Sequence, residues 1–305
     1  MLTTVQDGGR YGFQRFGMPV SGTMDRWSHQ MANLLVGNRP DDACLEAMMT
    51  GPEIIFSAAL SVAICGADMT PLLNGLSVPM WRTLRVKSGD QLSFSELKAG
   101  CRTYLAIEGG IDVPRVMGSR STCLRTRLGG YLGRPLKAGD VLTAFPDTSN
   151  KIHIRTVPEE FIPDFLHDQV IRIIPGPEVH RFTFAGIKNF LTGTYEITNH
   201  SDRMGYRLAG PEIAFSGKTT DIVSAGISPG TIQVTTNGQP IVLMADRQTT
   251  GGYCRIANVA SADLPLVAQM KPGETIRFRE ISLNEAQELV REQQRIIGIL
   301  MQGCW

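Results

Sequence analysis

Thr50-Gly-Pro-Glu-Ile-Ile-Phe-Ser57 recurs almost unchanged as Ala209-Gly-Pro-Glu-Ile-Ala-Phe-Ser216, 159 residues further along a chain of 305 residues. Each copy is followed, after a polar turn, by another apolar run that ends in glycine. A Gly-Pro turn before alternating apolar residues is typical of the entry to a β-strand. The repeat predicts two related β-domains, although a common turn preceding two unrelated strands would produce the same letters.

The composition of the whole chain favours a mainly β architecture. The 32 glycines and 17 prolines separate many short runs that are rich in Val, Ile, Leu, Thr and Phe. One turn signal occurs three times, at Lys87-Ser-Gly-Asp90, Lys137-Ala-Gly-Asp140 and Lys271-Pro-Gly-Glu274. Because glycine tolerates a positive φ, each signal predicts a tight turn that leads into a strand.

The two domains are predicted to span residues 1–150 and 151–305. The segments 146–150 and 158–164 have the Pro, Asp, Ser and Asn content of linkers and short turns. We therefore expect the boundary in this part of the chain.

Helices are expected to be few. Apolar residues recur at helical spacing between Met24 and Val36, and Gly37 follows as a stop. Ser282-Leu-Asn-Glu285 is a capping box that precedes a long apolar stripe, so a C-terminal helix is predicted there. A further helical segment is expected after Pro177.

Charge and composition exclude several classes of protein. Thirty basic and 29 acidic residues give a net charge of +1, so we expect no attraction to nucleic acid or to an anionic membrane. The most apolar stretch, residues 54–67, falls short of the roughly 20 residues that a membrane span needs. No basic and then apolar leader is visible at the N-terminus, which favours the cytoplasm.

The cysteines and histidines do not form a recognisable site. The six cysteines lack a Cys-x-x-Cys pair, and the five histidines lack the spacing of metal ligands. We therefore expect reduced thiols and no metal centre held by protein ligands.

A basic segment runs from Val113 to Gly139. It contains no acidic residue, but it holds Arg115, Arg120, Arg125, Arg127, Arg134 and Lys137 among several glycines. Guanidinium groups suit carboxylate or phosphate, and glycine allows backbone N–H groups to approach an anion. The segment is predicted either to bind an anionic ligand or to face solvent or an acidic partner surface.

Three further stretches are rich in hydrogen-bonding groups. Ser201-Asp-Arg-Met-Gly-Tyr-Arg207 places two arginines four residues apart, and Asp246-Arg-Gln-Thr-Thr-Gly-Gly-Tyr253 directly follows the apolar run 241–245. Polar residues at the end of a buried strand are typical of a site on a rigid scaffold, although an ordinary turn uses similar residues. Near the N-terminus, Asp7 and Arg10 are expected to form an ion pair or to orient a ligand.

Common catalytic motifs are absent. The sequence has no Gly-x-Ser-x-Gly, His-Glu-x-x-His, phosphate-binding P-loop or Gly-x-Gly-x-x-Gly pattern. Lys271 follows Met270, as a biotinylated lysine would, but proline comes next and the stretch is predicted to be a turn. We expect no covalently attached biotin.

Seven segments together resemble one known family. They are Thr3-Thr-Val-Gln-Asp-Gly-Gly-Arg10, Ala32-Asn-Leu-Leu-Val-Gly-Asn38, Tyr104-Leu-Ala-Ile-Glu-Gly-Gly-Ile-Asp-Val-Pro114, Gly118-Ser-Arg-Ser-Thr122, Ser201-Asp-Arg-Met-Gly-Tyr-Arg-Leu208, Gly238-Gln-Pro-Ile-Val-Leu-Met244 and Gln248-Thr-Thr-Gly-Gly-Tyr253. The family is the biotin-dependent carboxyltransferase-like group, also called KipA or allophanate hydrolase subunit 2. It includes the C subunits of 5-oxoprolinases and is related to the carboxyltransferase region of urea carboxylase.

The resemblance implies two cyclophilin-like β-barrel domains and an activity that depends on partners. The implied partners are a B subunit of the KipI or allophanate hydrolase subunit 1 type and an A subunit. The implied reaction is the ATP-dependent cleavage of 5-oxoproline to glutamate, with Mg²⁺ accompanying the ATP. Two alternatives stay open: a KipA-like regulator of a kinase inhibitor, and the carboxyltransferase component of a urea-carboxylase-like system.

Roles for individual residues follow as hypotheses from this activity. Asp246 and Arg203 are predicted to be catalytic, with Asp246 orienting water or a cation. The predicted substrate-binding or anion-binding residues are Asp7, Arg10, Arg120, Ser121, Arg207, Gln248, Thr249, Thr250 and Tyr253. The guanidinium groups of both halves are expected to converge on one anionic ligand in a cleft that a second polypeptide completes.

Overall fold

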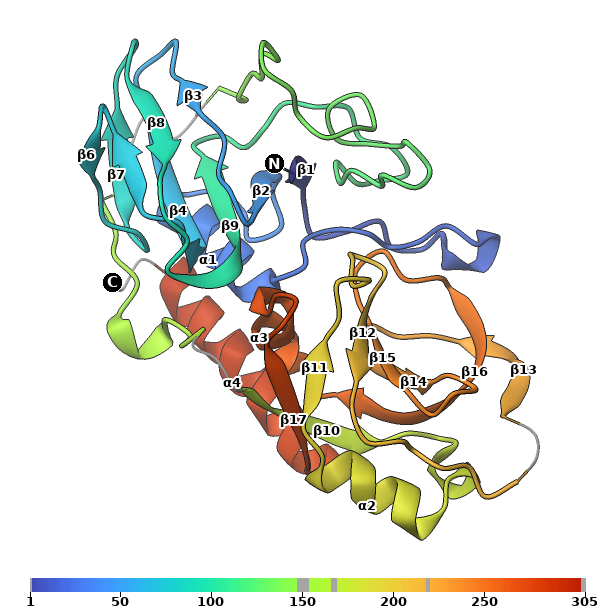
Figure 1. Cartoon of the computed structure of the whole chain (residues 1–305). Helices are drawn as coiled ribbons and strands as arrows, with labels where there is room; N and C mark the ends of the chain where they lie inside the picture. The colour runs from blue at the N-terminus through green and yellow to red at the C-terminus, as the bar shows by residue number, and fades with distance from the viewer. Residues whose placement is uncertain (1, 147–153, 166–168, 218–219, 303–305) are drawn as a thin grey trace. The chain divides into compact units, whose positions relative to one another are not determined.

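The structure is a computed structural model that describes residues 2–146, 154–165, 169–217 and 220–302 (Figure 1). The chain forms two compact units. The first comprises Met1–Tyr11, Ser21–Phe165 and Ile299–Trp305, and the second comprises Gly12–Val20 and Leu166–Gly298. The boundary predicted between residues 150 and 151 lies outside the described residues.

The first unit is built from two antiparallel sheets. One has the strand order β1-β2-β9-β4-β7 and the other has the order β3-β8-β5-β6. The strands are β1 (Leu2–Gln6), β2 (Cys44–Met48), β3 (Ile54–Ile55), β4 (Leu60–Asp68), β5 (Pro71–Leu73), β6 (Leu76–Ser77), β7 (Thr83–Val86), β8 (Gln91–Phe94) and β9 (Ala99–Ile107). A short 3-10 helix, η2, spans Glu159–Phe161.

One apolar core holds the first unit together. Val5, Leu45, Ile64 and Leu105 are among its buried residues, and Leu92 reaches it from the second sheet. Because side chains alternate along a strand, the other face of β1 carries Thr4 and Gln6, which are also buried. Strand β1 is therefore buried on both of its faces, one apolar and one polar.

Helix α1 (Arg26–Leu35) packs against β4 and β9, and nine of its ten residues are buried. The Asp25 carboxylate accepts a hydrogen bond from the backbone N–H of Ser28 and so caps the helix. This helix confirms the one that the sequence predicts between residues 24 and 36.

The second unit contains a closed barrel. Its ring runs β10-β17-β11-β12-β15-β14-β16, and β16 pairs with β10 again, while β13 lies outside the ring on β16 (Figure 1). The strands are β10 (Gln169–Pro175), β11 (Tyr195–Ile197), β12 (Gly205–Ala209), β13 (Asp221–Gly226), β14 (Thr231–Val234), β15 (Pro240–Leu243), β16 (Thr250–Val259) and β17 (Thr275–Glu280). The helices are η1 (Gln14–Phe16), η3 (Val179–Arg181), α2 (Phe184–Thr192), η4 (Ser261–Asp263), α3 (Leu264–Gln269) and α4 (Leu283–Met301).

Aromatic packing joins α2 to the barrel. The ring of Phe190 on α2 stacks on Phe278 of β17 at 4.7 Å between centroids, and Tyr195 lies 6.3 Å from Phe190. All three rings are buried. Because a helix as short as α2 is only marginally stable by itself, its apolar contacts with the barrel strands are what stabilise it.

The expected architecture is confirmed in its main features. The protein is mainly β, one unit is a closed seven-stranded barrel, and a C-terminal helix is present. In the described part of the first unit the strands form two sheets rather than one closed ring. At the start of α4, Ser282 Oγ accepts from the N–H of Glu285 and the Glu285 carboxylate accepts from the N–H of Ser282, which confirms the capping box.

The three Lys-x-Gly-acid signals all form the same turn. In each, the backbone N–H of the lysine donates to the acidic side chain, at 2.7 Å for Lys87, 2.7 Å for Lys137 and 3.0 Å for Lys271. Two turns lead into strands, β8 and β17, as predicted. The prediction of a strand after Lys137 is wrong, because residues 141–143 are irregular. Lys271 lies in the predicted turn and pairs with Glu274 at 3.4 Å.

The repeated Gly-Pro-Glu-Ile segments adopt less regular structure than predicted. The first copy provides the two-residue strand β3, whereas the second makes only an isolated bridge between Phe215 and Phe182. Both copies still bury a large apolar residue, Phe56 in the first and Ile213 in the second.

Within the part of the chain that the structure describes, no helix is both long enough and apolar enough to cross a membrane.

Candidate functional site

Asp7 holds together two segments of the first unit that are far apart in sequence. Its carboxylate accepts hydrogen bonds from Gly9 N–H at 2.9 Å, from Ser119 Oγ at 2.7 Å, from Arg120 N–H at 2.5 Å and from Ser121 Oγ. Burial raises the pKa of Asp7, but these hydrogen bonds outweigh burial and leave the pKa below its ordinary value. The carboxylate is therefore a fixed anion with saturated acceptors, better suited to positioning the loop than to removing protons.

Arg10 is fully buried beside this cluster. Its Nε donates to Val116 O at 3.0 Å and its Nη2 donates to Ser121 O at 2.9 Å. Its Nη1 has no hydrogen-bond partner, and no ion pair joins Asp7 and Arg10 among the described residues. The ion pair that the sequence suggests is thus not formed, since Asp7 is used by the serines and by backbone N–H groups.

Arg120 and Ser121 lie on the same loop. The Arg120 Nε donates to Val113 O at 2.9 Å, and its guanidinium lies over the ring of Phe145 at 4.8 Å. Ser121 is buried and bonds to Asp7. The structure therefore brings four of the predicted residues, Asp7, Arg10, Arg120 and Ser121, into one polar cluster.

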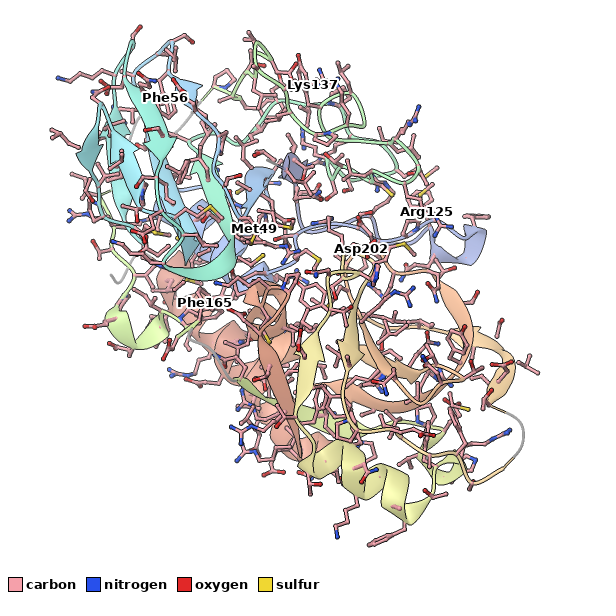
Figure 2. The ribbon with its side chains drawn as sticks, in the orientation of Figure 1. Met49, Phe56, Arg125, Lys137, Phe165 and Asp202 are labelled. Atoms are coloured by element: carbon pink, nitrogen blue, oxygen red, sulfur yellow. The ribbon has the colours of Figure 1, made fainter. Side chains whose placement is uncertain are left out.

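The basic segment that contains this loop has little regular structure. Figure 2 labels Arg125 and Lys137 on it. Arg134 pairs with Asp140 through two hydrogen bonds of 2.7 Å each. At least one of the six basic side chains of the segment therefore has a carboxylate partner just beyond the end of the segment.

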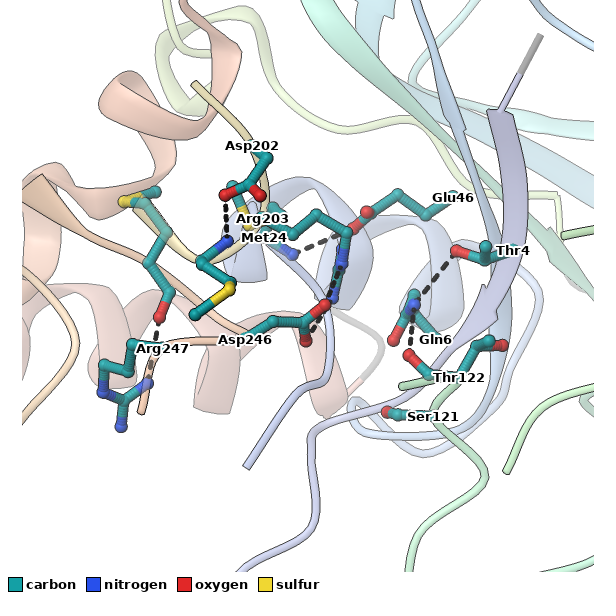
Figure 3. Close-up of polar contacts among 12 residues, drawn as sticks. Thr4, Gln6, Met24, Glu46, Ser121, Thr122, Asp202, Arg203, Asp246 and Arg247 are labelled. Atoms are coloured by element: carbon teal, nitrogen blue, oxygen red, sulfur yellow. Dashed lines mark hydrogen bonds and ion pairs between the residues drawn. The ribbon is translucent and has the colours of Figure 1, made fainter. Parts of the chain in front are cut away.

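A second polar network in the first unit lies on the face of the sheet covered by α1. Met24 N–H donates to the Glu46 carboxylate at 2.9 Å (Figure 3). The same carboxylate accepts from Tyr104 Oη at 2.8 Å, and Tyr104 Oη accepts from the N–H of Asp25 at 2.8 Å. Burial, followed by the charges of Glu46 and Asp25, raises the pKa of Tyr104 well above its ordinary value.

Sequence reasoning missed this network, together with Gln6. The signals were present: Glu46 is the one acidic residue of the strand Cys44–Met48, and Thr4 with Gln6 places polar residues at alternate positions of a buried strand. A polar residue at every second position of a strand is usually read as solvent-exposed, which here is wrong because α1 and the adjoining loop cover that face.

In the second unit, Arg203 and Asp246 form a buried ion pair. The Arg203 Nε donates to Asp246 Oδ2 at 3.0 Å and its Nη2 donates to Oδ1 at 3.4 Å, with side-chain exposures of 7% and 8% (Figure 3). The backbone N–H of Asp246 also donates to Arg203 O at 2.8 Å. The two residues predicted to be catalytic are thus in direct contact although they are 43 positions apart.

The remaining predicted residues of the second unit lie around the start of β16. Gln248 and Thr249 are partly buried in the loop before this strand, and Thr250 and Tyr253 lie on the strand itself. Arg207 is exposed on β12. Arg247, which was not among the predicted residues, is buried and donates from Nη1 to Met244 O at 3.2 Å.

The predicted residues therefore form two groups, one in each compact unit. The convergence of arginines from both halves on one ligand stays a prediction.

Comparison with known proteins gives the class of this chain. Residues 16–280 match the family described as carboxyltransferase domain, subdomain A and B. The chain belongs to this family, which confirms the resemblance seen in the sequence.

Individual relatives add detail. The chain is 41% identical to the C subunit of 5-oxoprolinase from Escherichia coli over 97% of its length and 93% of the relative, and 36% identical to that of Haemophilus influenzae over 95% and 92%. It is similar in structure to urea amidolyase of K. lactis, with a TM-score of 0.93 and 32% identity over 98% of this chain. It spans only 19% of that longer protein.

Proposed function

We propose that this chain is the C subunit of a 5-oxoprolinase and that it acts together with the A and B subunits. The observation that carries the proposal is the match to two proteins of that name over more than nine tenths of both sequences. A match of this extent leaves no large domain of these relatives without a counterpart here.

In this proposal the complex uses ATP, accompanied by Mg²⁺, to open the lactam ring of 5-oxoproline. Transfer of the γ-phosphoryl group to the lactam oxygen would make the ring carbon a better electrophile. Water then adds to that carbon and the carbon–nitrogen bond breaks, so that the nitrogen becomes the amine of glutamate and the former ring carbon is left as an acyl phosphate. A second water molecule hydrolyses this acyl phosphate to the γ-carboxylate and free phosphate. The task assigned to this chain is to bind and orient the anionic substrate, and buried guanidinium groups support that task.

The site residues retain distinct roles in this proposal. Arg10 keeps a free N–H donor, so it is the better candidate for direct contact with an anion. Arg203 shares its charge with Asp246, and this pair is proposed to position the loop that continues into Gln248 and Thr250. Asp7 is proposed to position Arg120 and Ser121 rather than to contact the substrate.

An omission experiment tests the function. The chain is co-expressed with the A and B subunits of the same genome, and 5-oxoproline-dependent release of ADP and glutamate is measured with and without it. We expect turnover only when all three proteins are present. Equal turnover by the other two proteins alone would refute the proposal.

A second function is favoured by one observation, the TM-score of 0.93 to urea amidolyase. On this reading the chain would transfer a carboxyl group from carboxybiotin, carried by another polypeptide, to urea. The same complex, supplied with a biotin carboxylase, its biotinylated carrier, ATP, bicarbonate and urea, distinguishes the two: urea-dependent ADP release that requires this chain, without 5-oxoproline turnover, would favour carboxyl transfer.

A further inference from the structure

Among the buried polar atoms without a hydrogen-bond partner in the described part of the first unit, two belong to side chains that bind adjacent positions of the backbone. They are Gln6 Oε1 and Arg10 Nη1, and both residues have an exposed fraction of 0%. Their side chains are fixed to consecutive carbonyl groups: Gln6 Nε2 donates to Thr122 O at 3.1 Å, and Arg10 Nη2 donates to Ser121 O at 2.9 Å. A free acceptor and a free charged donor thus adjoin one short stretch of backbone.

The orientation of the Gln6 amide is settled by its neighbours. The Thr122 carbonyl can only accept, so the atom that faces it is the amide nitrogen, which also donates to Thr4 Oγ1 at 3.0 Å. Both amide hydrogens are therefore used, and the free atom of Gln6 is its oxygen. A ligand that binds this oxygen has to supply a donor.

The charge of Arg10 has no counter-ion among the described residues. Its two hydrogen bonds go to neutral carbonyl groups, and the nearby Asp7 is saturated by other donors. A buried guanidinium without a carboxylate is unfavourable, and an unsatisfied N–H adds to this penalty. Arg10 Nη1 is thus suited to an anionic oxygen.

The backbone between the two side chains is rigidly placed. Thr122 N–H and Thr122 Oγ1 both donate to Val5 O at 2.9 Å. Gly129 and Gly130 pack against Ser121 and Thr122 so closely that a Cβ at either glycine would overlap them. The two free atoms are therefore held in position before any ligand arrives, which lowers the entropy lost on binding.

We propose that Arg10 Nη1 and Gln6 Oε1 form the recognition site for the lactam substrate, with the carboxylate of 5-oxoproline at Arg10 and its lactam N–H at Gln6. This inference rests on the proposed function. In 5-oxoproline the carboxylate is attached to the carbon that carries the lactam nitrogen, so one small molecule presents an anionic group and an N–H donor close together. Urea has N–H donors but no anionic group, so it satisfies only half of the pair.

The test compares two ligands on the assembled complex. The first is 5-oxoproline, and the second is its lactone analogue, 5-oxotetrahydrofuran-2-carboxylate, in which a ring oxygen replaces the N–H. Dissociation constants are measured by calorimetry without ATP, for the wild type and for Gln6→Met, Arg10→Lys and the exposed control Arg277→Lys. Gel filtration and thermal melting establish that each variant assembles.

We expect the wild type and Arg277→Lys to prefer the lactam about 10-fold, since one buried hydrogen bond depends on its N–H. Gln6→Met should remove this preference. Arg10→Lys should weaken both ligands by about 10-fold or more and keep the preference, because both ligands carry the carboxylate.

A preference for the lactam that survives in Gln6→Met would overturn the inference. A dissociation constant of Arg10→Lys within about twofold of the wild-type value would also overturn it, because so small a change means that no net hydrogen bond to the ligand has been lost. If Arg10→Lys does not assemble, the preference ratio of Gln6→Met decides alone. If the wild-type complex cleaves 5-oxoproline but Gln6→Met still prefers the lactam over the lactone, this inference is refuted and the proposed function is not. A wild type that neither binds nor cleaves 5-oxoproline refutes the proposed function itself.

Discussion

Gly129→Ala is the substitution that examines the polar cluster of the first unit most directly. Gly129 has φ +69°, and a Cβ there would overlap Ser121 O and lie 2.7 Å from Arg10 Nη2. Gly139 lies in the same irregular segment with φ +88°, but a Cβ there meets no atom within 4 Å. The two glycines therefore share the backbone strain and differ in close packing.

The magnitude follows from these two terms. An L-residue in the left-handed region costs about 1–2 kcal/mol, and alanine recovers about 0.4–1 kcal/mol through the unfolded state, so Gly139→Ala should lose about 1 kcal/mol. Overpacking against a fixed backbone carbonyl adds about 1–3 kcal/mol at Gly129. We expect Gly129→Ala to lose about 2 kcal/mol more than Gly139→Ala.

Urea unfolding followed by fluorescence measures both variants beside the wild type. With a slope near 2 kcal/mol per molar urea, the two midpoints should differ by about 1 M. Gly129→Ala should also weaken 5-oxoproline binding, because its Cβ displaces the Ser121 carbonyl that anchors Arg10. Equal losses of stability in the two variants would show that this close contact does not exist.

Two other substitutions test the ion pair and the fixed carboxylate. Asp246→Asn removes the bidentate carboxylate partner of the Arg203 guanidinium, so the free energy of unfolding should fall by about 3–5 kcal/mol. Urea titration measures this change, and a loss below about 1 kcal/mol would contradict the interpretation that the pair is buried away from water. The pKa of Asp7 is lowered from its ordinary value of 3.8 in the folded protein, so its stabilisation is present above that pH and is lost as pH falls through the folded value. Asp7→Asn should therefore flatten the dependence of stability on pH below about pH 4, and an unchanged acid limb would contradict the role given to its hydrogen bonds.

Much of the fold could be predicted because its signals are local. The capping box at Ser282 and the turn at Lys87 each depend on residues within four positions, so the sequence pattern and the geometry coincide. The strand expected after Lys137 failed for the opposite reason. The turn forms there, but the pairing that follows it is limited to an isolated antiparallel bridge between Ala144 and Ile111.

The site was harder to predict because its contacts are long-range. Arg203 and Asp246 could each be nominated from the composition of their loops, but their pairing depends on strands that bring positions 43 apart together. An ion pair with Arg10, three residues away, was one of the two roles expected for Asp7, but its carboxylate bonds to serines more than 110 positions distant. The burial of Gln6 and Glu46 follows only from the covering of their face of the sheet, which strand alternation alone does not reveal.

The ring of the second unit depends on the strand that the chain supplies last. Strand β17 lies between β10 and β11, pairing in parallel with β10 and antiparallel with β11. Its Ile276 pairs with Gln169, the first residue of β10. A nascent chain released only as far as β16 therefore has β10 and β11 with bare edges, each a template for pairing with a neighbouring molecule. Closure of the barrel in this unit therefore has to wait until β17 has been synthesised.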